Sequence, residues 1–235
     1  MIVYGANPVM EALRAHPERV RWVAVAREDS RRHQRVIELA RQGKVAVRFL
    51  AGRELGRLSG EGVHNGVVAE VSAESYADFE ALAGSVERVF LLDGITDPQN
   101  FGAILRVADG FGFGLVVIPE HDSVGLTPVA IKASAGASEW VPVAQVTNLS
   151  RAIERLKKEG FWVYGADGEG EPLSGAGLTG KVAIVLGSEG RGIRKNVLEH
   201  CDVRLSIPMS GHVDSLNVAA AAAVFAWEVW RQRAG

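Results

Sequence analysis

The amino-acid sequence predicts an α/β protein, in which a small α/β domain precedes a larger domain built on a mostly parallel sheet. Segments patterned as strands alternate with helical segments along the chain, an order typical of α/β folds. From residue 88 onward the strand segments become apolar runs such as "KVAIVLG" (181–187), which indicates strands buried on both faces. Glycine-rich and polar loops follow some of these strands, and parallel sheets bind ligands beyond the carboxyl ends of their strands.

The composition, with 47% hydrophobic and 23% charged residues in a chain of 235, is that of an ordinary globular protein. The single cysteine, Cys201, excludes an internal disulfide framework and fits a reducing cytosol. The first residues lack the basic start and apolar core of a secretory signal. The apolar run 218–229 contains Glu228 and is shorter than the roughly 20 residues of a bilayer span. We therefore expect a soluble, cytoplasmic protein with no membrane contact.

Charge is distributed unevenly along the chain, although the net charge is only −2. Residues 1–60 hold 12 Lys and Arg against 6 Asp and Glu, a net of +6, and the remainder carries −8. Eleven of those 12 basic residues are arginine, which binds phosphate through a planar fork. This asymmetry indicates that the N-terminal part meets a polyanion such as RNA, with Arg31, Arg32 and Arg35 among the candidate contacts. A solvated, arginine-rich helix face is the structural alternative.

We expect residues 1–71 to form the small domain and residues 72–87, which have a polar start and no strand pattern, to form a linker. The predicted strands of the small domain cover 19–26, 44–50 and 66–72, and its helices cover 7–16, 31–43 and 52–58. Asn7 is expected to cap the first helix, with Pro8 at its first position.

Residues 88–235 are expected to form the larger domain. Its predicted strands cover 88–94, 115–120, 140–146, 161–167 and 181–187, and the helices between and after them cover 97–112, 127–137, 149–160 and a segment from 218 onward. The loops 91–100, 186–193 and 207–217 are the ones expected to line a ligand site. Ser215 is a natural N-cap for the alanine-rich helix that follows the last loop.

The common nucleotide and metal signatures are missing from the sequence. No G-x-G-x-x-G lies between a strand and a helix, and no G-x-x-x-x-G-K-[ST] is present. The histidines are scattered, and no clustered His, Cys and Asp set predicts a metal site. A dinucleotide, a nucleoside triphosphate and a metal are therefore not expected as cofactors.

The three loops nevertheless carry a resemblance to a known family. Three segments resemble, in order and spacing, the three motifs of the SpoU (TrmH-like) RNA ribose 2′-O-methyltransferases of the SPOUT superfamily. They are "DPQNFGAILRVADGFG", "IVLGSEGRGI" and "IPMSGHVDSLNVAAAAAVFAWE". The resemblance covers residues 88–235. The N-terminal segments "YGANPVMEAL" and "HNGVVAEV" are similar to the substrate-binding domain of the RlmB-type members, which methylate guanosine in 23S rRNA.

The resemblance implies a deep trefoil (α/β) knot in the larger domain, which no periodicity in the sequence predicts. It also implies a homodimer formed through this domain, for which Phe225, Trp227 and Trp230 are aromatic anchors. In this family S-adenosyl-L-methionine is held in the knot, largely by backbone groups of the second and third motif loops. Carried over to this chain, the implied cofactor-binding residues are Leu186, Gly187, Ile207, Met209, Ser215 and Leu216.

The implied reaction is methyl transfer to a ribose 2′-hydroxyl, a poor nucleophile that needs both positioning and proton removal. The family motifs place the implied catalytic residues at Asn100, Arg106, Glu189, Ser215 and Asn217. Structural alternatives exist: Asn100 could cap a helix, Arg106 could pair with Asp109, and Glu189 could merely close a turn. A guanidinium does not readily give up a proton, so we expect Arg106 to clamp a phosphate beside the target ribose.

Two alternative functions remain open at the level of sequence. One is a tRNA ribose 2′-O-methyltransferase, and the other is a non-catalytic, RNA-binding knot protein in ribosome assembly. The separate N-terminal domain favours 23S rRNA or its precursor over tRNA. The intact Asn100, Arg106 and "SLN" (215–217) argue against a non-catalytic protein.

Overall fold

The computed structural model describes residues 1–72, 76–213 and 215–234. Its contacts divide the chain into two compact units, one of Met1–Ser75 with Leu126–Trp140 and the other of Tyr76–Gly125 with Val141–Gly235. Residues 73–75 of the expected linker lie outside the described residues. Within the described ranges, no helix is both long enough and apolar enough to cross a bilayer.

The N-terminal unit is built on a four-stranded mixed sheet in the order β1-β4-β2-β3. Its strands are β1 (Ile2–Tyr4), β2 (Val20–Ala26), β3 (Ala46–Leu50) and β4 (Val67–Val71). Strand β4 runs antiparallel to both β1 and β2, whereas β2 and β3 are parallel. Strand β1 was not predicted from the sequence, because three residues are too few to show an alternation of apolar and polar side chains.

Helices cover both faces of this sheet. They are α1 (Ala6–Ala15), α2 (Gln34–Gln42) and α3 (Gly52–Leu58), with a 3₁₀ turn at Pro17–Arg19. Val9 of α1 and Ile37 of α2 are buried in one core with Val23 of β2, whereas Leu55 of α3 packs with Trp22 in a second core on the other face. Alternate residues of β2 thus point into different cores, as the period of a strand requires.

Two helix starts differ from those the sequence predicts. Helix α1 begins at Ala6 with Gly5 as its N-cap residue, so Asn7 lies within the first turn and its side chain caps nothing. Helix α2 begins at Gln34, which leaves Arg31 and Arg32 in the turn before it. A glycine with φ of 102° can make the turn into α1 without a side-chain cap.

The segment Leu126–Trp140 joins the N-terminal unit, although the sequence analysis assigned it to the larger domain. It contains α6 (Pro128–Ala133), capped by Thr127, and a 3₁₀ turn at Ala137–Glu139. Ile131 is buried in the same core as Val9, and the Trp140 indole donates a hydrogen bond to Glu11. These contacts join residues more than 100 positions apart, which local patterning does not detect.

The second unit contains a six-stranded sheet in the order β10-β8-β9-β5-β6-β7, with every pair of neighbouring strands parallel. Its strands are β5 (Arg88–Asp93), β6 (Leu115–Pro119), β7 (Val143–Val146), β8 (Phe161–Pro172), β9 (Lys181–Gly187) and β10 (Val203–Ser206). The predicted α/β fold with a mostly parallel sheet is confirmed. The short edge strand β10 was not predicted.

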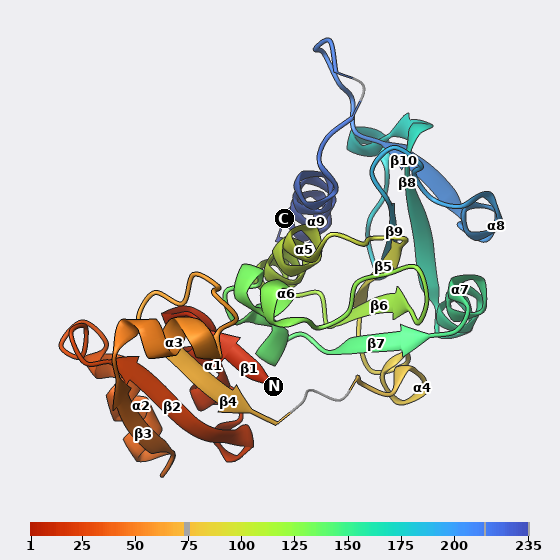
Figure 1. Cartoon of the computed structure of the whole chain (residues 1–235). Helices are drawn as coiled ribbons and strands as arrows, with labels where there is room; N and C mark the ends of the chain where they lie inside the picture. The colour runs from red at the N-terminus through yellow and green to blue at the C-terminus, as the bar shows by residue number, and fades with distance from the viewer. Residues whose placement is uncertain (73–75, 214, 235) are drawn as a thin grey trace. The chain divides into compact units, whose positions relative to one another are not determined.

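Helices lie on both faces of the parallel sheet (Figure 1). They are α4 (Phe79–Leu82), α5 (Pro98–Phe111), α7 (Leu149–Lys158), α8 (Lys195–Leu198) and α9 (Val218–Ala234), with a 3₁₀ turn at Leu173–Gly175. Leu91 of β5 is buried in a core with Phe79 of α4 and Ile153 of α7. Helices α5 and α9 pack against each other on the opposite face (Figure 1).

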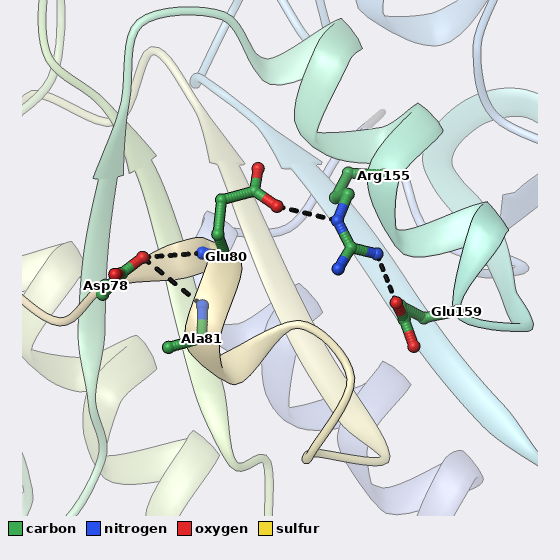
Figure 2. Close-up of polar contacts among 5 residues, drawn as sticks. All are labelled: Asp78, Glu80, Ala81, Arg155 and Glu159. Carbon is green, nitrogen blue, oxygen red and sulfur yellow. Dashed lines mark hydrogen bonds and ion pairs between the residues drawn. The ribbon is translucent and has the colours of Figure 1, made fainter.

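Helix α4 lies inside the stretch expected to be a linker and is anchored to α7 (Figure 2). Asp78 caps it by accepting hydrogen bonds from the N–H groups of Glu80 and Ala81. Arg155 of α7 donates to Glu80 at 2.7 Å and also to Glu159, and that hydrogen bond lowers the pKa of Glu159. Helix α4 is therefore already part of the second unit, although it precedes β5 in the chain.

Candidate active site

The loop after β9 forms a tight turn that carries Glu189. Ser188 and Gly192 exchange two backbone hydrogen bonds, of 3.2 and 2.9 Å, which close the turn. Gly190 and Gly192 have φ of 81° and 67°, a left-handed backbone that side-chain-bearing residues rarely adopt. The glycines in "GSEGRG" thus hold Glu189 at the tip of the turn.

Gly187, the last residue of β9, has no room for a side chain. A Cβ at this position would lie 2.1 Å from the carbonyl carbon of Gly192 and 2.2 Å from the backbone nitrogen of Ile193. The close approach folds the end of the loop back over the strand end, so only glycine fits.

An ion pair between a half-exposed arginine and a buried carboxylate fixes the far end of the same loop. Asp93 ends β5, and its fully buried carboxylate accepts hydrogen bonds of 2.7 Å from both the backbone N–H and Nε of Arg194. Hydrogen bonds between a guanidinium and a carboxylate are charge-assisted and stronger than those between neutral groups. The sequence analysis did not single out either residue, because 101 positions separate them.

The N-cap of α9 is Asn217, not Ser215. Asn217 Oδ1 accepts hydrogen bonds from the N–H groups of Ala219 at 3.0 Å and Ala220 at 3.4 Å. The prediction that Ser215 caps this helix is wrong, because the first helical residue is Val218 and Ser215 lies too far from the first turn. Ser215 is exposed and lines a pocket instead.

Three side chains from separate parts of the chain meet in one polar cluster: Asn100 in the first turn of α5, Glu189 in the loop after β9, and Asn217 at the start of α9. Asn217 Nδ2 donates to Glu189 Oε1 at 2.7 Å and to Asn100 Oδ1 at 2.8 Å. Asn100 Nδ2 donates to the same Glu189 oxygen at 3.0 Å. Asn100 does not cap α5, since Asp97 accepts the hydrogen bonds at the start of that helix. We name Asn100, Glu189 and Asn217 the polar cluster.

Beside the polar cluster is a pocket of about 290 Å³ at the carboxyl edge of the sheet. Its walls include all the residues predicted to bind the cofactor, namely Leu186, Gly187, Ile207, Met209, Ser215 and Leu216. Glu189 also lines the pocket and so belongs to both the pocket and the cluster. The volume is close to the lower limit of roughly 300 Å³ that is usual for small-molecule sites.

Sequence reasoning missed several walls of this pocket. Asp167 lies in β8 after its apolar run and lines the pocket, as the carboxylate of Glu189 also does. Its Oδ2 lies 3.7 Å from Nη1 of Arg204. Phe225 of α9 and Leu205 of β10 supply buried apolar surface. Asp167 could have been found from its place at the end of the predicted strand "FWVYGAD", whereas Phe225 required knowledge of how α9 packs.

Arg106 is not part of the polar cluster. Its side chain is exposed on α5, and within the described residues it forms no hydrogen bond or ion pair, including none with Asp109. A structural Arg106–Asp109 pair is therefore absent from this structure. The guanidinium is available to an external anion.

An aromatic patch is exposed on α9 and α5. Trp227 and Trp230 stack with ring centroids 5.1 Å apart, and Phe111 meets Trp227 edge-on at 6.4 Å. The two tryptophans remain 49% and 41% exposed. A cluster of large aromatic residues at this exposure is typical of a protein interface.

The candidate RNA-binding arginines of the N-terminal unit are all exposed. Arg35 lies 3.7 Å from Glu38 on α2. Arg31 and Arg32 form no ion pair with any residue in the described part of the chain. Two of the three are thus uncompensated cations.

The fold and the pocket define an α/β protein with a pocket at the carboxyl edge of a parallel sheet, where sheets of this kind bind ligands. The chain belongs to the SpoU rRNA methylase family, whose model matches residues 87–227. A second family model, described as RNA 2′-O ribose methyltransferase substrate binding, matches residues 2–77. The predicted family membership is confirmed, and with it the class of enzyme.

Particular relatives cover nearly the whole chain. The 23S rRNA (guanosine-2′-O-)-methyltransferase RlmB of Pseudomonas syringae is 41% identical over 240 residues, 98% of this chain and 95% of the relative. RlmB of Haemophilus influenzae is 42% identical, over 99% and 98%. The solved SpoU methyltransferase AviRb of Streptomyces viridochromogenes, in complex with AdoMet, has a TM-score of 0.82 at 26% identity and covers 100% and 91%.

Proposed function

We propose that this protein transfers a methyl group from S-adenosyl-L-methionine to the ribose 2′-hydroxyl of a guanosine in 23S rRNA or its precursor. The observation that carries the proposal is Glu189, which lines the pocket and is also held by both amides of the polar cluster. A ligand pocket and a fixed carboxylate at its edge are what transfer to a poor nucleophile requires. The proposed target, a guanosine of 23S rRNA, is taken from the names of the RlmB relatives.

The pocket fits the proposed cofactor. Gly187 lines the pocket, and a Cβ there would collide with the backbone of Gly192 and Ile193, so only glycine lets this turn lie beside the pocket. Leu186, Ile207 and Leu216 would hold the cofactor from the surrounding loops. Bound there, S-adenosyl-L-methionine supplies a methyl group activated by a positively charged sulfur.

The polar cluster would position the substrate hydroxyl. Both amide donors converge on Oε1 of Glu189, so that oxygen is engaged and the carboxylate cannot rotate freely. Oε2 makes no hydrogen bond to the described residues, and it is free to accept one from a ribose hydroxyl. Arg106, unpaired on α5, would bind a neighbouring phosphate through its planar fork.

The remaining sequence predictions stay part of the proposal. The support for a homodimer through the second unit is the exposed aromatic patch of Phe111, Trp227 and Trp230. The support for RNA binding by the N-terminal unit is the unpaired Arg31 and Arg32 beside Arg35. We also propose the predicted division into residues 1–71, 72–87 and 88–235 as functional regions, and action in the cytoplasm, where ribosomal RNA is modified.

The trefoil knot is likewise proposed. Its support is the path of the chain, which leaves the edge strand β10, lines the pocket at Ile207, Met209, Ser215 and Leu216, and then packs α9 against α5. Threading of this segment through an earlier loop would explain why small alanines dominate the start of α9, because they allow close packing.

A methyl-transfer assay with labelled cofactor tests the proposed reaction. The purified full chain is incubated with a 23S rRNA transcript, with an unmodified tRNA pool and with no RNA. We expect label in 23S rRNA, on the ribose of a guanosine whose 3′ phosphodiester bond resists alkaline cleavage. Label in tRNA instead would establish the tRNA alternative, and RNA binding without any transfer would establish the non-catalytic one.

A further inference from the structure

A second pocket, of about 380 Å³, lies in the N-terminal unit and shares no residue with the candidate active site. It forms where residues 4–8 of "YGANPVMEAL" and residues 64–66 of "HNGVVAEV" meet, the segments whose function the active site does not explain. The lining residues are Gly5, Ala6, Asn7, Pro8, Arg32, His33, Asn65, Lys132 and Ala135. No carboxylate is among them.

The start of helix α1 provides backbone donors to this pocket. The N-cap is Gly5, no side chain caps the helix, and no acidic residue lies in its first turn. The N–H groups of Ala6 and Asn7 have no acceptor among the described residues, Pro8 has no N–H, and the Val9 N–H bonds to the Gly5 carbonyl. Free N–H groups at a helix start attract anions, because they add to the positive end of the helix dipole.

Two cations line the same pocket. Arg32 is exposed and forms no ion pair with the described residues. Lys132 of α6 has its Nζ 5.1 Å from the centroid of the Tyr4 ring, and its positive charge is otherwise uncompensated within the described chain. Asp29 is the carboxylate that acts on His33 at this site, and the two cations outnumber it, so the balance of charge is positive.

A buried, unpartnered polar atom gives a separate indication of a ligand. His33 lines the pocket with only 5% of its surface exposed, and its Nε2 makes no hydrogen bond of normal geometry within the described residues. The polar groups that act on this imidazole are the Asn65 backbone and the Asp29 carboxylate. Buried polar atoms are nearly always paired in native proteins, so the exception requires an explanation. Ala135, on the rim, has φ of 55°, a conformation that costs free energy and is concentrated at ligand sites.

We propose that this pocket binds a phosphate group of the RNA substrate. The N–H groups of Ala6 and Asn7 donate to its oxygens, and Arg32 and Lys132 neutralise its charge. The inference rests on the proposed function for the presence of an RNA substrate. It adds a defined anchoring site in the N-terminal unit, which would hold the RNA while another part reaches the active site.

Substitutions in the full chain test this site. Ala6→Pro removes one backbone N–H, and the helix should tolerate it because proline is common at the first helical position. Ala6→Ser is the matched control, since it keeps that N–H. Arg32→Gln and Lys132→Gln each remove one charge. Their controls are Arg53→Gln and Lys44→Gln, exposed positions of the same unit outside the pocket.

The readout is the Kd for a 23S rRNA transcript across a KCl titration. We expect each pocket variant to weaken binding by about threefold to tenfold, and the two charge variants to reduce the salt slope by about one. Ala6→Pro should weaken binding without changing the slope, because it removes a donor but no charge. The controls should bind as the wild type does, and cofactor affinity and melting temperature should be unchanged in all variants. Wild-type affinity in all three pocket variants would overturn the proposal.

A titration with inorganic phosphate separates an RNA site from a site for free anions. We expect the amide NMR signals of Ala6 and Asn7 to shift with phosphate, and 23S rRNA to compete for the same site. Phosphate binding without any effect of the pocket variants on RNA affinity would overturn the assignment to RNA. Pocket-dependent RNA binding without methyl transfer would instead refute the proposed function and leave the anchoring site intact.

Discussion

Asn217 donates a hydrogen bond of 2.7 Å to Glu189, a residue 28 positions earlier in the chain. The same side chain uses its other atom, Oδ1, to cap the first turn of α9. One residue therefore starts the C-terminal helix and fixes the carboxylate of the polar cluster. The two tasks use different atoms of the amide, so substitution can separate them.

Asn217→Ser should abolish most methyl transfer while leaving stability nearly unchanged. Serine is also a good N-cap, but it is too short to donate to Glu189 and Asn100. Asn217→Ala should lose activity and also about 1 kcal/mol of unfolding free energy, since the cap is gone. Chemical denaturation and the methyl-transfer rate of both variants check this. Full activity in the serine variant would show that the hydrogen bond to Glu189 is dispensable.

Gly187→Ala should weaken cofactor binding by at least tenfold. The new Cβ would meet backbone atoms at 2.1 and 2.2 Å, so the turn that carries Glu189 must move. Gly175→Ala, where a Cβ meets nothing within 4 Å, is the matched control. Calorimetric titration of both variants with S-adenosyl-L-methionine gives the two affinities. Equal affinities would remove Gly187 from the proposed binding site.

Arg106→Lys should lose most methyl transfer, while cofactor affinity and melting temperature change little. A phosphate clamp needs the planar, bidentate guanidinium, which a lysine does not provide. The exposed Arg106 makes no ion pair in the described structure, so no loss of stability is expected. The measurement is kcat and KM for RNA, with a cofactor Kd and a melting curve on the same preparation. Near-wild-type kcat/KM would contradict the clamp.

Trp227→Asp should convert a dimer to a monomer in light scattering at micromolar concentration. The substitution places a charge in the aromatic patch, and an unpaired charge at the centre of an interface is costly. Trp162→Asp is the control, because Trp162 is 57% exposed but lies outside the patch. A monomeric wild-type protein would refute the proposed dimer directly.

Glu139 should make the stability of the protein fall as the pH rises. Burial raises the pKa of Glu139 above its ordinary 4.5, and Arg19 and His16 oppose that shift. The folded state therefore binds the proton more tightly than the unfolded state does. This contribution to stability is complete below pH 4.5 and is lost as the pH rises through the folded pKa.

The Glu139→Gln variant gives the measurement of that dependence. The variant keeps the shape of the side chain and removes the titration. We expect its unfolding free energy, relative to the wild type, to rise by roughly 1 kcal/mol between pH 4 and pH 7, since a buried oxygen without a hydrogen bond costs about that much. A relative stability that stays constant over this interval would show that Glu139 titrates alike in both states.

The sequence by itself determined the architecture of the second unit. Continuous apolar runs such as 181–187 predicted buried parallel strands. Because parallel sheets bind ligands at the carboxyl ends of their strands, the loops after these strands were predicted to line the site. The site residues were identified from the motifs in those loops, and the structure brings Asn100, Glu189 and Asn217 within hydrogen-bonding distance. The strands were found from the periodicity of neighbouring residues, whereas the site residues were found from the resemblance of these motifs to a known family.

Only the tertiary structure decided which side chain performs which task. Ser215 and Asn217 are equally good caps in sequence, and the helix start at Val218 selects Asn217. The bond between Asp93 and Arg194 spans 101 positions, and the pocket of the N-terminal unit joins Asn7 to Lys132. Such contacts depend on how separate elements pack in three dimensions, and the spacing of residues along a strand or helix contains no information about that packing.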